Sequence, residues 1–123
     1  MQNQNSKLKT DLKHITYQYS IKVIEFIDTL SKDTSTDVIA NQLLRSATSI
    51  GANIVEAKGA SSKRDFTNFF SHSLKSANES LYWLGLLKDA KKINSAQLEY
   101  LLDETNELAN ILGSSILTLR GKK

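Results

Sequence analysis

The residues of this sequence best suited to chemistry are basic side chains, which concentrate in one part of the chain. Residues 58–92 hold seven Lys and Arg against three Asp and Glu, whereas residues 93–119 hold four acidic side chains and no basic one. Lysine and arginine bind phosphates through counterion release, without recognising base sequence. The candidate phosphate-binding residues are Arg45, Lys58, Lys63, Arg64, Lys75, Lys88, Lys91 and Lys92. The alternative is that these residues only provide solubility and complement helix ends.

Catalytic and metal-binding patterns are missing from the sequence. The chain has no Cys, which excludes disulfides, thiolate zinc sites and cysteine nucleophiles. A di-iron bundle needs two Glu-x-x-His pairs, whereas this chain offers only Asp11-x-x-His14. Arg64 and His72 are too far apart for the Arg-to-His motif of HEPN-type ribonucleases. We therefore expect no enzyme activity, no metal, no cofactor and no small-molecule substrate.

Polar side chains also recur at helical spacing along two segments. One line comprises Gln42, Arg45, Ser49, Asn53 and Glu56, and the other comprises His72, Ser76 and Glu79. Side chains three and four residues apart lie on one side of a helix. A catalytic or ligand site is one interpretation, but no nucleophile is paired with a base. We favour a solvated face or a hydrogen-bond network between helices that fixes their register. Asn53 and Glu56 lie beside the core stripe, from where they could bond across to the next helix.

Long helices are needed to position these side chains, and the sequence favours them. The 123 residues include no Pro and only five Gly, so few positions interrupt an element. Apolar residues recur at spacings of three and four, which is the period of a helix face. We predict helices at about residues 7–32, 36–58, 63–92 and 95–120. Their short connections predict an all-α, antiparallel up-down-up-down four-helix bundle, with residues 1–123 forming one domain.

Capping signals mark the predicted helix boundaries. The second, third and fourth helices are expected to begin at Thr34-x-x-Asp37, Ser62-x-x-Asp65 and Asn94-x-x-Gln97. Gly59 and Gly121 are the predicted C-terminal caps. No apolar run approaches the roughly 20 residues that span a bilayer. The first five residues are polar and lack the apolar core of a secretory signal. We expect a cytoplasmic protein without membrane contact.

Residues 81–87 are apolar in every direction around a helix axis, which predicts contacts beyond one bundle. A helix that is apolar all round is buried all round, whereas a small bundle leaves each helix an outer face. The second helix has a weaker form of this pattern. The predicted subunit-interface residues are Leu44, Val55, Tyr82, Trp83 and Leu86. The alternative is a set of scattered surface hydrophobic residues, which are common in soluble proteins.

Residues 45–57 read Arg-Ser-Ala-Thr-Ser-Ile-Gly-Ala-Asn-Ile-Val-Glu-Ala, and Ser-Lys-Arg-Asp-Phe follows at residues 62–66. This pattern resembles the bacterial four helix bundle protein family, also called 23S rRNA intervening-sequence proteins. The matching motif residues, for which we expect structural roles, are Ser49, Asn53, Glu56, Asp65, Phe66 and Glu79. Gly51 stands where the family usually has Pro, so a proline kink is missing although glycine still permits a bend.

The resemblance implies a homo-oligomer, with pentameric rings known in the family, and no established enzymatic activity. The family's genes occur in insertions within 23S rRNA genes. A related branch accompanies diversity-generating retroelements, where the bundle binds a reverse transcriptase and nucleic acid. We therefore predict a non-enzymatic homo-oligomer that binds RNA, DNA or a nucleic-acid-processing protein through basic surfaces. The alternative is a protein–protein interaction scaffold without a nucleic-acid ligand.

Overall fold

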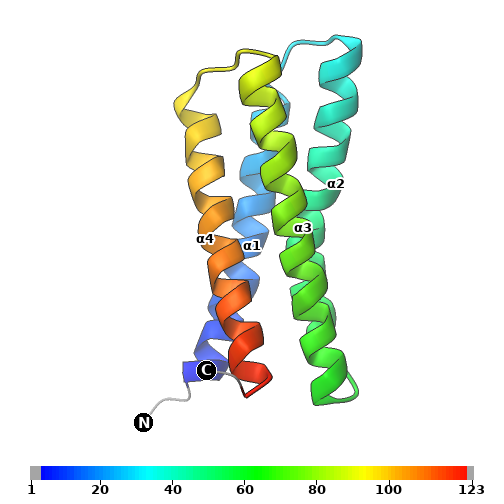
Figure 1. Ribbon diagram of the computed structural model, residues 1–123, viewed down its shortest axis with the longest axis vertical. Helices are drawn as coiled ribbons and strands as arrows, with labels where there is room; N and C mark the ends of the chain where they lie inside the picture. The colour runs from blue at the N-terminus through cyan, green and yellow to red at the C-terminus, as the bar shows by residue number, and fades with distance from the viewer. Residues whose placement is uncertain (1–3, 122–123) are drawn as a thin grey trace.

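A computed structural model describes the backbone of residues 4–121 and the side chains of residues 11–121. This part of the chain forms four helices and no strand, namely α1 (Gln4–Ile27), α2 (Thr34–Ala57), α3 (Lys63–Ala90) and α4 (Ala96–Leu119). The α1–α2 and α3–α4 connections lie at one end of the bundle, here called the loop end (Figure 1). The α2–α3 turn lies at the other end, called the turn end, together with the start of α1 and the end of α4 (Figure 1). The predicted all-α class with four helices is confirmed.

The helix boundaries agree with the predictions except at the end of the first helix and at two caps. The first helix ends at Ile27 rather than near residue 32, because the following backbone bonds tighten into turns. Ser62 is the N-cap of α3, as predicted. The caps predicted at Thr34 and Asn94 are wrong by one residue, because the side chains of Asp33 and Ser95 accept the capping hydrogen bonds instead.

The two glycines predicted to cap the C-terminal ends of helices, Gly59 and Gly121, differ in backbone conformation. Gly121 has a φ of 69° and follows α4 in the left-handed conformation that glycine favours. The prediction for Gly59 is wrong, because α2 is capped by Lys58 at a φ of −63° and Gly59 does not adopt a positive φ. After α3 it is Lys92, not a glycine, that turns the chain with a φ of 58°.

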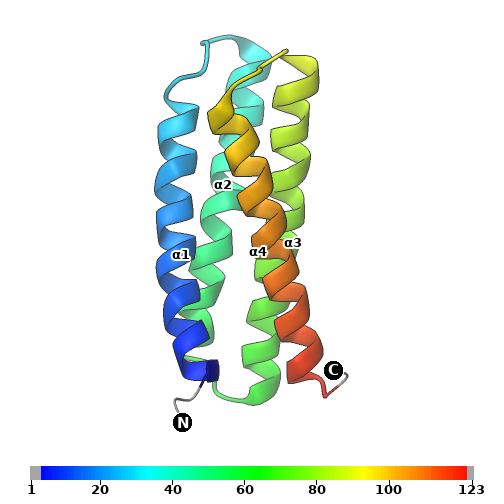
Figure 2. The same ribbon diagram turned by 90° about the vertical axis from the view of Figure 1, so that its left-hand side faces the viewer.

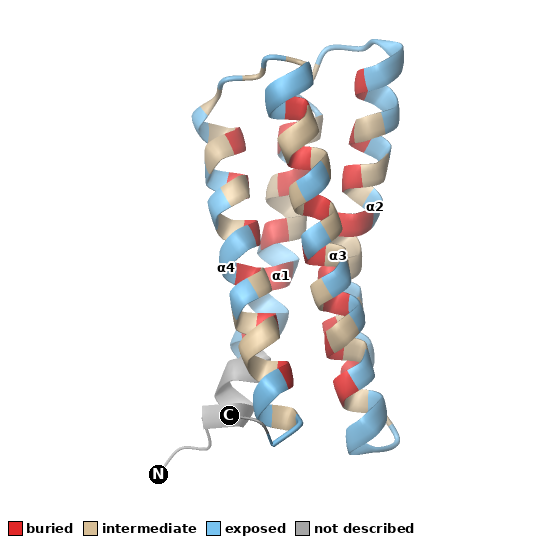
Figure 3. Ribbon diagram, in the orientation of Figure 1, coloured by how far each residue is buried: buried red, intermediate tan, exposed pale blue. Residues whose placement is uncertain are grey.

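The core lies along the inner faces of all four helices, where buried positions face one another (Figure 3). Its largest fully buried side chains include Tyr19, Phe26, Leu43, Ile50, Leu84, Leu101 and Leu112. The Tyr19 hydroxyl lies 2.6 Å from Thr105 Oγ1 and links α1 to α4. Among the described side chains, every buried nitrogen or oxygen has a hydrogen-bond partner.

The helix pairs differ in how closely they approach. A Cβ atom at Gly51 would lie 3.0 Å from Thr16 Oγ1, so the absence of a side chain lets α2 pack tightly on α1. The α2 helix continues through Gly51, and the bend that glycine would permit does not interrupt it. On the other side, α4 runs obliquely to α1 and diverges from it toward the turn end (Figure 2). A cavity of about 220 Å³ lies there between α1, α3 and α4.

Candidate nucleic-acid interface

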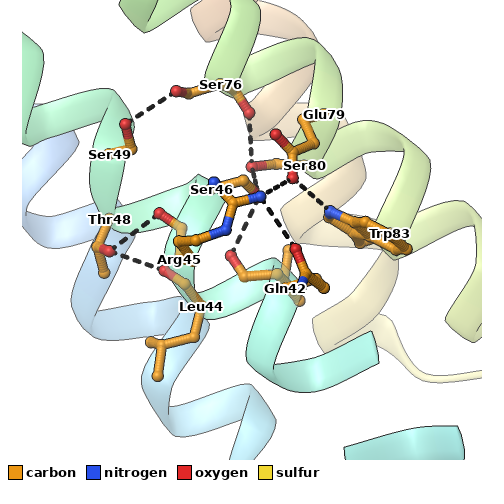
Figure 4. Close-up of polar contacts among 11 residues, drawn as sticks. Gln42, Leu44, Arg45, Ser46, Thr48, Ser49, Ser76, Glu79, Ser80 and Trp83 are labelled. Carbon is orange, nitrogen blue, oxygen red and sulfur yellow. Dashed lines mark hydrogen bonds and ion pairs between the residues drawn. The ribbon is translucent and has the colours of Figure 1, made fainter. Parts of the chain in front are cut away.

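The two polar lines meet where α2 packs against α3. Ser76 Oγ donates to Ser49 Oγ at 2.9 Å, and the hydroxyls of Ser46 and Ser80 are 2.8 Å apart (Figure 4). Ser73 Oγ donates to the backbone carbonyl of Ile50 at 2.8 Å. These short side chains fill little space and satisfy one another, so the two helices are held in a fixed register. The predicted hydrogen-bond network between helices is confirmed for Ser49 and Ser76.

Glu79 contacts two other predicted residues at the outer edge of this network. Its Oε2 atom forms an ion pair with Arg45 and accepts the indole N–H of Trp83 at 2.9 Å (Figure 4). Arg45 also donates to Gln42 Oε1 at 3.0 Å. The Arg45 side chain is 59% exposed, so this pair contributes little to stability, on the order of 0–1 kcal/mol. Arg45 is therefore positioned by its own chain, and Trp83 belongs to the same network.

The hydrogen bonds of Asn53 and Asp65 stay within single helices or at their ends, whereas Phe66 packs against the core. Asn53 Nδ2 donates to the Ser49 carbonyl at 2.9 Å, so the expectation that Asn53 bonds across to α3 is wrong. Glu56 is exposed and likewise makes no bond to α3 among the described residues. Asp65 accepts a 2.7 Å hydrogen bond from Ser61 in the first turn of α3. The Phe66 ring stacks on Phe70, with ring centroids 4.8 Å apart.

At the loop end, two of the predicted phosphate-binding lysines are paired with carboxylates. Lys88 Nζ lies 2.9 Å from Glu99 Oε2, and Lys91 Nζ lies 3.1 Å from Asp33 Oδ1. The hydrogen bond to Glu99 raises the pKa of Lys88. The Thr36 backbone N–H and then Lys91 lower the pKa of Asp33 to about 2. The chain's own acidic groups thus neutralise much of the positive charge predicted here.

At the turn end, the basic side chains are exposed. Lys58 caps α2, while Lys63 and Arg64 begin α3, and none of the three forms an ion pair with another described side chain. Arg120 joins them from the end of α4, with its Nη2 atom 3.5 Å from Ser71 Oγ. We call these four residues the turn-end basic group.

Arg120 is not among the predicted phosphate-binding residues, because it lies more than fifty positions from Arg64 in the sequence. The predicted up-down topology could have placed Arg120 at the turn end, because it brings the end of the last helix beside the α2–α3 turn. Lys75 and Lys92, the two remaining candidates, are exposed elsewhere on the molecule. The eight predicted residues therefore do not form one patch, and only Lys58, Lys63 and Arg64 gather at a single open site.

The five predicted interface residues lie on two surfaces. Val55 lines a cleft with Tyr17 of α1, and Leu44 projects away from α3 (Figure 4). On α3, Tyr82 is 61% exposed and contacts Trp83 edge to face, while Leu86 is half-buried. A single flat interface therefore cannot contain all five side chains.

Among the described residues, no group of three or more His, Cys, Asp and Glu side chains is placed to hold a metal ion. None of the four helices, within residues 4–121, is long and apolar enough to cross a membrane.

Comparison with known proteins gives a family and a related structure. The sequence model of the 23S rRNA-intervening sequence protein family matches residues 9–114. The chain is also similar to a crystal structure of a protein of unknown function from the S23 ribosomal protein family of Bacteroides thetaiotaomicron VPI-5482. The two are 36% identical with a TM-score of 0.78, and the match covers 85% of this chain and 97% of that chain. No curated protein matches the chain.

Proposed function

We propose that this chain, which belongs to the 23S rRNA-intervening sequence protein family, is a non-enzymatic, homo-oligomeric bundle that binds RNA through its turn-end basic group. The observation that carries the proposal is the exposure of Lys58, Lys63 and Arg64 at one end, beside Arg120. None of the three candidates is held by an ion pair with a described residue, whereas Lys88 and Lys91 at the other end are.

Electrostatics explains why the open cations matter. A lysine already paired with a carboxylate must break that pair before it contacts a phosphate, whereas an open lysine only releases counterions. Charges further apart than about 8 Å are screened at physiological salt, so grouping at one end is what makes the cations act together. A homo-oligomer repeats the group and converts weak contacts into multivalent binding.

The proposal is tested by fluorescence anisotropy with a labelled, structured RNA and the full chain. The test variant carries Lys58→Gln, Lys63→Gln and Arg64→Gln, and the matched control carries Lys88→Gln and Lys91→Gln. We expect the turn-end variant to lose roughly tenfold or more in affinity, corresponding to about 1.4 kcal/mol or more, and the control to lose much less. Equal losses for both variants would remove the turn-end basic group from the site.

A protein–protein scaffold is the second candidate function. It is supported by large apolar side chains on the surface, because Tyr17 and Tyr82 are 66% and 61% exposed. Tyrosine is enriched at protein interfaces, where its ring packs and its hydroxyl stays hydrated. If no RNA binds even at low salt, the scaffold becomes the leading function.

A further inference from the structure

An open cleft lies at the turn end, between the α2–α3 turn and the end of α4. Its volume of about 680 Å³ falls within the range of ligand-binding clefts. Lys58 lines it from the end of α2, Lys63 from the start of α3, and Leu119 from the end of α4. We call it the turn-end cleft. Two members of the turn-end basic group therefore border a hollow rather than a flat surface.

The floor of the turn-end cleft is apolar. Ala57 and Phe66 line it together with Leu119. Ala57 is buried, whereas Phe66 and Leu119 are half-buried and pack against the core, so part of each larger side chain stays at the surface. The Phe66 ring is held by its stacking on Phe70. Because removal of apolar surface from water is favourable, this floor favours a ligand that has an apolar face.

The hydroxyl groups of the cleft are already engaged by the chain itself. Ser61 and Ser62 both line the cleft. Ser61 Oγ donates to Asp65 Oδ2 at 2.7 Å, and Ser62 Oγ accepts the backbone N–H of Asp65 at 3.1 Å. Recognition by hydrogen bonds to these two serines is therefore weak. What the cleft offers a ligand is positive charge at its rim and apolar surface on its floor.

This combination matches the chemistry of an unpaired nucleotide. Proteins that bind single-stranded nucleic acid combine positive charge along the backbone with side chains that cover the flat face of a base. In an RNA duplex the bases are stacked inside, and mainly phosphates and sugars are accessible to side chains. A duplex would therefore contact only the lysines at the rim and leave the apolar floor in water. An unpaired nucleotide would cover the floor as well.

We propose that the turn-end cleft binds an unpaired nucleotide of RNA, with its base on the apolar floor and its phosphates on Lys58 and Lys63. The inference rests on the proposed function and adds to it the kind of RNA that is bound. Base identity matters little, because the two serine hydroxyls are held by Asp65. The cleft lies at one end of the bundle, which leaves the sides of the helices available for contacts between copies (Figure 1).

The first test compares two RNAs with the native full chain. The affinity for a labelled oligouridine, which stays unpaired, is measured by fluorescence anisotropy beside that for a fully paired RNA duplex of the same length. Charge alone would favour the duplex, because its phosphates are more closely spaced. We expect the oligouridine to bind roughly fivefold or more tightly, since the cover of one base contributes at least about this factor. Equal affinities, or a tighter duplex, would overturn the inference.

The second test removes the apolar floor without a change of charge. The variant is Leu119→Ser, and the matched control is Leu117→Ser, because Leu117 is 46% exposed on the same helix and is not among the residues that line the cleft. We expect Leu119→Ser to bind oligouridine roughly fivefold or more weakly and the duplex with native affinity. The control should bind both RNAs as the native chain does.

An unchanged affinity of Leu119→Ser for oligouridine, or an equal loss for both RNAs, would show that the floor does not hold a base. Circular dichroism establishes that both variants are folded. The comparison of the two RNAs with the native chain decides the inference even if Leu119→Ser does not fold.

The outcomes also separate this inference from the proposed function. If neither RNA binds at low salt, both are overturned. If the duplex binds at least as tightly as oligouridine and the Lys58→Gln, Lys63→Gln, Arg64→Gln variant loses that binding, the unpaired nucleotide alone is overturned and the proposed function stands.

Discussion

Tyr19 illustrates how a single side chain links sequence-distant helices. Its ring is buried between α1 and α4, and its hydroxyl lies 2.6 Å from Thr105 Oγ1. Burial raises the pKa of Tyr19 to about 12 from an ordinary value of 10.0. The neutral phenol is therefore the form that the folded protein accommodates.

Replacement of this hydroxyl should have two measurable effects. Tyr19→Phe should lower the free energy of unfolding by about 1 kcal/mol in urea denaturation at neutral pH, because a buried hydrogen bond is lost. The stabilisation of the neutral phenol is complete below pH 10 and is lost as the pH rises toward 12, since the unfolded tyrosine ionises first. The native chain should therefore lose more stability than Tyr19→Phe over this range. If the native chain and Tyr19→Phe lost the same stability between pH 10 and pH 12, the raised pKa of Tyr19 would be contradicted.

Asp33 should lose its contribution to stability at acid pH, whereas Tyr19 loses its contribution at alkaline pH. It caps α2 and contacts Lys91, and its pKa falls from an ordinary 3.8 to about 2. Its contribution to stability is present above pH 4 and is lost as the pH falls toward 2. Asp33→Asn keeps a capping oxygen but cannot ionise. We expect the stability difference between native and variant to shrink over this range in thermal unfolding, and a constant difference would show that Asp33 does not titrate as described.

The caps also show what sequence alone could resolve at the residue scale. Asp33 and Thr34 are adjacent and equally able to cap a helix. The choice depends on which residue adopts extended backbone, and here it is Asp33, with a φ of −144° and a ψ of 163°. The sequence therefore predicts that α2 starts near this position but not which side chain accepts the bond.

At the scale of elements, helix periodicity was sufficient to predict the four helices, because apolar spacing is a local property. It could also place Ser49 and Ser76 on polar lines. It could not show which residue on α3 meets which on α2, because that register depends on how closely the helices approach. Short hydroxyl side chains permit the 2.8 Å contact between Ser46 and Ser80, and the contact is visible only once both helices are placed.

Gly51 and Gly113 offer a matched test of helix approach. Both lie within helices, but a Cβ at Gly113 would meet nothing within 4 Å, whereas one at Gly51 would meet Thr16 Oγ1 at 3.0 Å. Gly113→Ala should stabilise the protein by about 0.5–1 kcal/mol through helix propensity. Gly51→Ala gains the same propensity but overpacks α1 against α2, at a cost of about 1–3 kcal/mol. Chemical denaturation should therefore give Gly51→Ala a lower free energy of unfolding than Gly113→Ala. Equal stabilisation of the two variants would show that α1 shifts at little cost to fit the added methyl group.

At the scale of the whole molecule, the two ends of the bundle differ in how their candidate cations are paired. At the loop end, Lys88 and Lys91 pair with carboxylates and Lys92 does not, whereas at the turn end none of the three candidates forms an ion pair with a described residue. Composition showed a basic surplus in residues 58–92 but could not show which of these basic side chains pair with carboxylates. Lys91 pairs with Asp33, 58 positions away, and such a partner follows only from the three-dimensional arrangement. Arg120 reaches the turn end for the same reason. The sequence thus predicted the basic candidates, and the packing of the helices determined which of them lie together.

The salt dependence of RNA affinity tests this account most directly. The apparent dissociation constant of a labelled, structured RNA is measured by anisotropy over a range of salt concentrations for the native chain and for the Lys58→Gln, Lys63→Gln, Arg64→Gln variant. Each lost phosphate contact should reduce the slope of log affinity against log salt by roughly 0.7–0.9. We predict a slope shallower by roughly two units or more in the variant. Steep and equal slopes in both proteins would mean that RNA binds elsewhere and would contradict the central claim.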